Sequence, residues 1–184
     1  MAAKTNPSQL TVIKLLRRHY FFIAAYVASI IVFDMWNLIA KDAIGRRWLA
    51  AGLLLTLNTL AWYLAKLKHK RGGSYQLILL SLILADIIFV AFNVYWERGM
   101  ASNSVALFAV PLILAAAYKS RSALLGIASL CSAAYGVAAV SYFFDNYGEG
   151  YRVELYGTVG FSVAIFFIVA GLLLAVTHPP KEKP

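Results

Sequence analysis

The segment from Tyr75 to Trp96, YQLILLSLILADIIFVAFNVYW, is long and apolar enough to cross a lipid bilayer as a helix. At a rise of about 1.5 Å per residue, Asp86 lies roughly 16 Å from Tyr75, near the middle of a hydrocarbon core about 30 Å thick. Asn93 follows seven residues later and returns to almost the same helix face. A carboxyl group is costly at this depth, so Asp86 is a candidate functional residue.

The composition extends this interpretation to the whole chain, because 61% of the 184 residues are hydrophobic and only 14% are charged. We expect an all-α polytopic membrane protein, a six-transmembrane-helix bundle over residues 19–176. An amphipathic basic leader precedes it at residues 1–18, expected as an interfacial helix, and a short polar tail follows at residues 177–184. The predicted spans are His19–Ala40, Trp48–Leu67, Tyr75–Trp96, Met100–Tyr118, Ser122–Phe144 and Val153–Val176.

The positions of the basic residues predict the orientation, since short cytoplasmic loops are enriched in Lys and Arg. With the N-terminus inside, the inner segments hold twelve of the 17 basic residues and the outer segments hold five. The sequence therefore predicts a multi-pass protein of the cell membrane with both termini cytoplasmic. The connection Lys41–Arg47 is the exception, because it places three basic residues outside.

The formal net charge of +9 comes from residues in short loops beside apolar spans. Anionic lipids at the inner face are the expected counterpart of this charge, and nucleic acid is not. A typical inner loop is KLKHKR at residues 66–71.

Polar residues in the first three spans define a candidate site for a small polar or cationic solute, or for a proton. Asp34 and Asn37 share one face of the first span, and Asn58 lies in the second. We expect them to converge with Asp86 and Asn93 in an outward-facing polar cavity. The alternative for the Asn residues is hydrogen bonding that holds helices together.

The middle of the six spans contains no Lys or Arg. Asp86 is therefore expected to be protonated, solvated in a cavity, or paired with a cation brought from elsewhere. Ala24 and Ala28 form a small-residue face on the first span, suited either to close packing within the bundle or to docking a membrane partner or second copy. The chain lacks the motifs of hydrolases and P-loop enzymes and has no metal-spaced His or Cys pair, so we expect no enzymatic activity, metal or cofactor.

The stretch from Ser102 to Val140, SNSVALFAVPLILAAAYKSRSALLGIASLCSAAYGVAAV, resembles the paired-helix region of multi-span sensor modules in bacterial histidine kinases. There an apolar helix with a central proline runs into a short basic turn and an alanine- and leucine-rich helix. Only a short tail follows Val176, so the resemblance implies a sensor or ligand-binding module without a kinase output domain.

The size, six spans and inward termini are also similar to the substrate-binding subunits of energy-coupling vitamin transporters, where an alanine-xxx-alanine face on the first helix docks the shared transmembrane subunit. Ala24 and Ala28 would fill that role here. The main hypothesis is a non-enzymatic, sensor-like or solute-binding module around Asp86. The alternatives are a small transporter or transporter substrate-binding subunit, and a membrane scaffold for partner proteins.

Overall fold

The computed structural model describes residues 7–36, 38, 41–67, 73–146 and 152–177, and all of its regular elements in these residues are helical. The chain divides into two compact units, Met1–Ala85 and Asp86–Pro184. The boundary falls within the helix α3 (Gly73–Glu97), so the first half of α3 belongs to one unit and the second half to the other. The two units are described separately.

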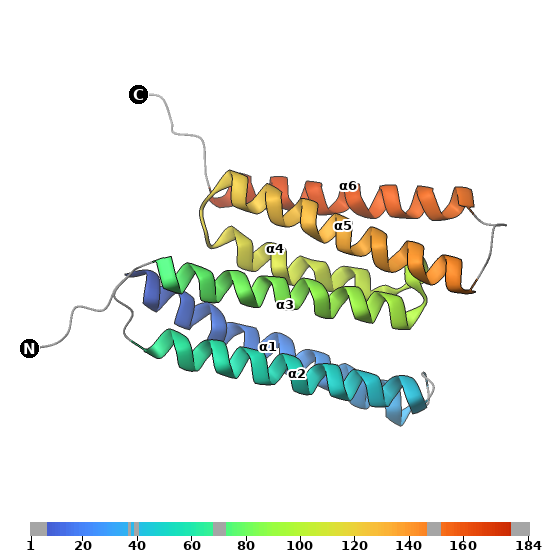
Figure 1. Ribbon diagram of the computed structural model, residues 1–184, viewed down its shortest axis with the longest axis horizontal. Helices are drawn as coiled ribbons and strands as arrows, with labels where there is room; N and C mark the ends of the chain where they lie inside the picture. Colours follow the sequence, from blue (N-terminus) through green and yellow to red (C-terminus); the bar gives the residue numbers. More distant parts are fainter. Residues whose placement is uncertain (1–6, 37, 39–40, 68–72, 147–151, 178–184) are drawn as a thin grey trace, which may run out of the picture. The chain divides into compact units, whose positions relative to one another are not determined.

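The first unit contains α1 (Pro7–Met35) and α2 (Lys41–Lys66), which pack side by side in opposite directions (Figure 1). Apolar side chains at helical spacing fill the contact between them, because residues three or four apart share one face. The buried residues on α1 are Gln9, Val12, Leu16, His19, Ile23, Tyr26 and Ile30, and those on α2 are Ile44, Arg47, Ala50, Ala51, Leu54, Asn58, Ala61 and Ala65.

The observed helix limits differ from the predicted spans at both ends of this pair. The described part of the predicted leader is continuous with the first span, and its Gln9 Nε2 donates a hydrogen bond of 3.0 Å to the carbonyl oxygen of Ala65 on α2. The helix α1 ends at Met35, before the predicted limit of Ala40. The predicted loop Lys41–Arg47 forms the first turns of α2, because Ile44 and Arg47 continue its buried face.

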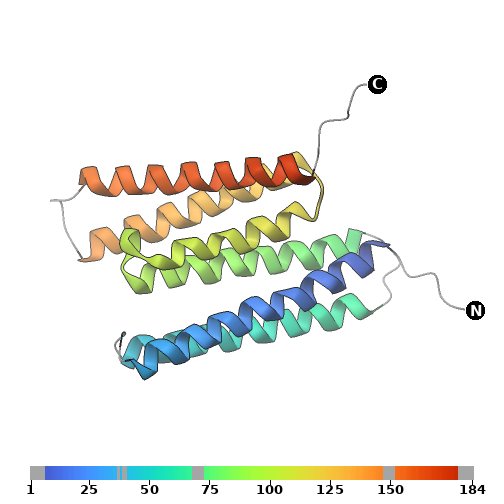
Figure 2. The ribbon, with the colours of Figure 1, turned by 180° about the vertical axis from the view of Figure 1, so that it is seen from behind.

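The second unit runs back and forth through the end of α3, a short helical segment, α5 (Arg121–Asn146) and α6 (Arg152–Thr177), as Figures 1 and 2 both show. The helices α4, α5 and α6 contact one another. The core of the unit is aromatic: the Phe108 ring lies 5.1 Å from the Phe166 ring and 6.3 Å from the Tyr135 ring, centroid to centroid.

The segment between α3 and α5 changes helix type along its length. It contains the 3₁₀ helices η1 (Gly99–Ala101) and η2 (Asn103–Phe108), followed by α4 (Ala109–Ala116). Pro111 is the third residue of α4, where the first turn needs no N–H donor from it.

Five helices, α1, α2, α3, α5 and α6, are long and apolar enough to cross a membrane. The segment Asn103–Ala116 is apolar but shorter. A 3₁₀ helix rises about 2.0 Å per residue and an α-helix about 1.5 Å, so its six and eight residues together extend roughly 24 Å. The prediction of an all-α multi-pass membrane protein is confirmed, and the sixth crossing remains a prediction.

Candidate functional site

The buried face of α3 carries two polar side chains in the second unit. Asp86 is completely buried and Asn93 is 1% exposed, with the fully buried Val90 between them. The seven-residue spacing places both on the side that faces the protein interior. Asn93 Nδ2 donates a hydrogen bond of 2.8 Å to the Phe89 carbonyl oxygen, one turn earlier in the same helix.

A hydrogen bond at the end of α3 sets the register between α3 and α5. Tyr95 Oη donates to Asp145 Oδ2 over 2.8 Å, and the two helices run in the same direction (Figures 1 and 2). Asp86 lies nine residues before Tyr95, and Tyr135 lies ten residues before Asp145. These separations correspond to about 14 and 15 Å along the helices, so Asp86 and Tyr135 lie at almost the same height.

Tyr135 brings a second polar group to this height. Its side chain is completely buried, and its hydroxyl group has no hydrogen-bond partner among the described residues. Cys131, one turn earlier on the same face of α5, is also completely buried and lies within electrostatic range of Asp86. A buried hydroxyl without a hydrogen bond is costly, and such groups mark sites where a protein binds water or a small polar molecule.

A second polar cluster lies at the end of the same α3 face, and sequence reasoning missed it. The half-buried Glu97 accepts three hydrogen bonds at Oε2: from Ser102 Oγ over 2.5 Å, from Ser104 Oγ over 2.6 Å and from Ser104 N over 3.0 Å. The contact arises because η1 and η2 turn the chain back over the end of α3. The only sequence signal is the close spacing of two serines after an acidic helix end.

Gly99 makes this return possible. Its φ of +60° is disfavoured for other residues, and a Cβ atom there would lie 2.7 Å from Cδ1 of Tyr142 on α5. The Tyr142 ring in turn packs edge-on against Tyr95, with centroids 6.0 Å apart. The cluster around Glu97 is thereby attached to the ends of both α3 and α5.

Asn58 in the first unit bonds to α1. Its Oδ1 accepts a hydrogen bond of 3.2 Å from His19 Nδ1, and its Nδ2 donates to the Leu16 carbonyl oxygen over 3.3 Å. All these groups are buried. This arrangement matches the alternative considered for the Asn residues, which is hydrogen bonding between helices.

Asp34 lies away from Asn58 in the same unit. It is exposed near the end of α1, fifteen residues beyond His19 and therefore about 22 Å along the helix. The structure does not bring Asp34 and Asn58 together. Asn37 lies outside the described residues, and its place in the predicted site stays a prediction.

The small-residue face of α1 is available for contacts. Ala24 and Ala28 are both exposed, whereas the residues that pack on α2 lie on another side of the helix. Their predicted docking role is compatible with this exposure but is not tested by it.

Within the described part of the chain, no group of three or more His, Cys, Asp or Glu residues could hold a metal ion.

Comparison of the chain with family models, curated proteins and solved structures found no match. The resemblances to kinase sensor modules and to vitamin-transporter subunits therefore stay predictions, carried by the residues quoted for them.

Proposed function

We propose that this protein is a non-enzymatic membrane module that binds a proton or a small polar or cationic solute beside Asp86. The observation that carries the proposal is the buried Tyr135 hydroxyl, which has no hydrogen bond within the described chain and lies at the height of the buried Asp86. A carboxylate can take up a proton as an O–H bond or accept hydrogen bonds from a protonated amine, and a phenol beside it can accept a further hydrogen bond.

The face of α3 suggests how a polar species would reach this height. Asn93 lies about 10 Å beyond Asp86 along the helix, and Glu97 lies about 16 Å beyond it, on the same side. Three polar side chains at these intervals form a series from the end of α3 to the middle of the bilayer. Such series are how membrane proteins build ion and proton pathways.

The proposed orientation has six crossings with both termini in the cytoplasm. In the second unit α3 and α5 run in the same direction, so the segment between them returns across the unit (Figure 1). The end of α3 with Glu97 then faces outward, which gives the series of polar groups an outer entrance. Anionic lipids would contact the basic inner ends of the helices.

The first test is thermal unfolding of the detergent-purified protein across a pH series and with added amines, amino acids and vitamins. We expect a ligand-dependent or pH-dependent rise in Tm for the wild type. Asp86→Asn should abolish it, and Tyr135→Phe should reduce it. Glu154→Gln, which changes an exposed acid at the start of α6, is the matched control and should behave as the wild type. A response that survives both Asp86→Asn and Tyr135→Phe would overturn the proposal.

Sensing and transport are distinguished by access from the two sides of the membrane. Cys131 is the only cysteine and is buried, so Cys131→Ala gives a background for single cysteines placed along α3. A sensor or binding module predicts labelling of the Asn93 and Glu97 positions from the outside only. Labelling of the same positions from both sides would instead identify a transporter.

A scaffold function is the second candidate, and the exposure of Ala24 and Ala28 favours it. Replacing both alanines with leucine would block close helix approach. Loss of a co-purifying membrane partner, or of a homo-oligomer, would support docking through this face. An unchanged assembly state would count against it.

A further inference from the structure

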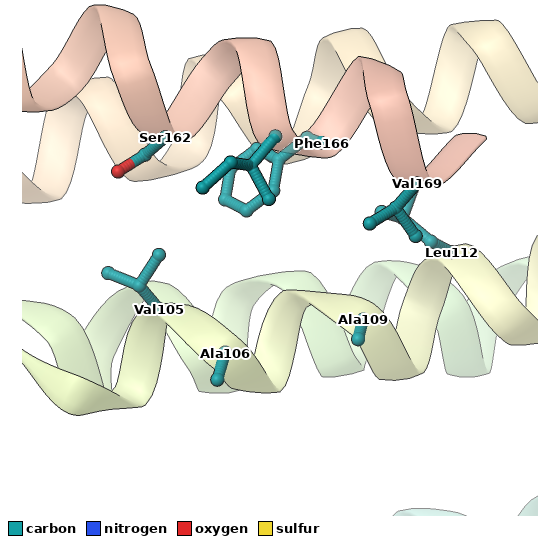
Figure 3. Close-up of a pocket in the computed structure, with 8 residues that line it drawn as sticks. Val105, Ala106, Ala109, Leu112, Ser162, Phe166 and Val169 are labelled. Atoms are coloured by element: carbon teal, nitrogen blue, oxygen red, sulfur yellow. The ribbon is translucent and has the colours of Figure 1, made fainter. Parts of the chain in front are cut away.

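An apolar cavity of about 250 Å³ lies in the second unit between the η2–α4 segment and α6 (Figure 3). Small side chains on one wall create the space, chiefly Ala106 and Ala109, with Val105 beside them. The opposite wall is α6, which contributes Ser162 and Phe166. Ala106 is exposed, so the cavity is open to the surface of the protein at this residue.

Ser162 places one polar group in this apolar cavity. The residue is 7% exposed, and its hydroxyl has no hydrogen bond to any residue in the described part of the chain. Other helical hydroxyl groups behave differently: Ser129, Ser132 and Thr177 each donate to the carbonyl oxygen four residues earlier. Figure 3 shows the Ser162 hydroxyl on the side of α6 that faces η2. It is therefore available to a bound molecule.

The depth of Ser162 restricts the class of that molecule. The residue lies ten positions from Arg152 and fifteen from Thr177, about 15 and 22 Å from the two ends of α6. If α6 crosses the bilayer, Ser162 lies deep in the hydrocarbon core, about 30 Å thick. A polar atom bound there belongs to a molecule dissolved in the membrane interior, because the headgroups of phospholipids remain at the surface.

The aromatic side chain of Phe166 in the wall of the cavity favours a bound molecule that contains a ring. Phe166 is 4% exposed and its position is fixed by two aromatic neighbours, Phe108 at 5.1 Å and Tyr135 at 6.0 Å between centroids. An apolar protein cavity of about 150 Å³ already binds benzene, so a cavity of about 250 Å³ has room for a substituted ring. Phe166 lines the cavity, so a bound ring would pack against the part of its side chain that faces the cavity.

We propose that the cavity between η2–α4 and α6 binds a membrane-dissolved, ring-bearing molecule with one carbonyl oxygen, which accepts a hydrogen bond from Ser162 while its ring packs on Phe166. This site adjoins the Asp86 site, because Phe166 packs against the Tyr135 ring, but the proposal does not rest on the function proposed above. An acceptor oxygen suits Ser162 because the hydroxyl then satisfies its own donor.

Benzophenone is a suitable probe, since it is an apolar aromatic ketone and, when irradiated, inserts into C–H bonds near its carbonyl carbon. The full-length protein in phosphatidylcholine liposomes would be labelled over a concentration series and the adducts located by mass spectrometry. We expect saturable labelling of the peptides that contain Val105 and Ser162. Two unlabelled competitors are added in the dark, before irradiation of the labelled benzophenone probe. Diphenylmethane, which has the same two rings without the oxygen, should reduce the labelling less than unlabelled benzophenone does.

Two variants test the two parts of the site. Ala109→Phe fills the cavity and should abolish saturable labelling, whereas Ala164→Phe, at an exposed position on α6, should leave it unchanged. Ser162→Ala removes one hydrogen bond and should raise the half-saturating concentration about three- to tenfold. In Ser162→Ala, diphenylmethane and benzophenone should compete equally.

The proposal is overturned if labelling is linear in concentration, or if it maps to lipid-facing residues of several helices. It is also overturned if Ser162→Ala, folded with the Tm of the wild type, binds benzophenone as tightly as the wild type does. The Ser162→Ala result decides the question even if Ala109→Phe fails to fold.

Discussion

Arg47 lies over the ring of Phe33, with its guanidinium carbon 5.3 Å from the ring centroid. Only 6% of Arg47 is exposed, so this cation is part of the contact between α2 and α1. Arg47 was one of the basic residues that disagreed with the predicted orientation. Because the Arg47 guanidinium makes a cation–π contact with Phe33, its position is explained by helix packing. It is therefore weak evidence on which side of the membrane this end of α2 lies.

We expect Arg47→Ala to lower the free energy of unfolding by about 1–2 kcal/mol, because a desolvated cation–π contact and the packing of the side chain are both lost. Arg46→Ala is the control, since Arg46 is adjacent and exposed. Unfolding in mixed micelles with increasing dodecyl sulfate measures both. Equal effects of the two substitutions would show that the Phe33 contact contributes nothing.

Asn58 links α2 to α1 by two buried hydrogen bonds, to His19 and to Leu16. Asn58→Ala should reduce stability by about 0.6–1.7 kcal/mol, the range found for hydrogen bonds between membrane helices. Thr56→Ala should have a smaller effect, because Thr56 is exposed and bonds only to its own helix. The same micelle titration compares them, and a larger loss for Thr56→Ala would contradict the assignment.

Gly99→Ala should be strongly destabilising, by about 2–5 kcal/mol, since it adds a left-handed backbone penalty to a clash with Tyr142. Gly157→Ala is the control, because a methyl group there meets nothing within 4 Å. Adding Tyr142→Ala to Gly99→Ala should recover part of the loss by removing the clash. If Gly99→Ala has the same Tm as the wild type, the conclusion that η1 closely approaches α5 at Gly99 is wrong.

Glu97→Gln should loosen the turns that follow α3, because hydrogen bonds to a charged acceptor are about twice as strong as neutral ones. We expect faster amide hydrogen exchange over residues 99–108, and above all at Ser104, whose N–H bonds to Glu97. Glu154→Gln changes an exposed acid at the start of α6 and should leave this exchange unchanged. Unaltered exchange in Glu97→Gln would mean that the serine contacts do not hold the turn.

Topology is tested by reporter fusions after Lys66, Ala101, Lys119 and Asn146. Six crossings with both termini inside predict cytoplasmic reporters after Lys66 and Lys119 and external reporters after Ala101 and Asn146. If Asn103–Ala116 does not cross, the reporters after Ala101 and Lys119 will report the same side. That outcome would leave five crossings.

The helices could be predicted from the sequence because a run of about 20 apolar residues has few alternatives to a membrane helix. The limits of α1 and α2 near Trp36, by contrast, could not be predicted from the sequence. Lys41–Arg47 reads as a polar loop, yet Ile44 and Arg47 fall on the face that continues through Ala51 and Leu54. A buried Arg is visible only when its aromatic partner is known.

Only part of the candidate site described above could be predicted from the sequence, for a similar reason. The seven-residue interval between Asp86 and Asn93 places both on one face by helix geometry alone. Tyr135 was missed, because an aromatic residue inside a span is ordinarily a packing residue. Glu97 was missed because its serine contacts depend on 3₁₀ turns, whose reversal of direction has no periodic pattern in the sequence.

The 3₁₀ geometry of η2 has a consequence for the surrounding lipid. A segment that extends roughly 24 Å is several ångströms shorter than the hydrocarbon core it would cross. Such hydrophobic mismatch is relieved by local thinning of the bilayer, at a cost of a fraction of a kcal/mol per ångström. The other five apolar helices have 25 to 29 residues each, so such thinning would be confined to the lipid beside η2 and α4.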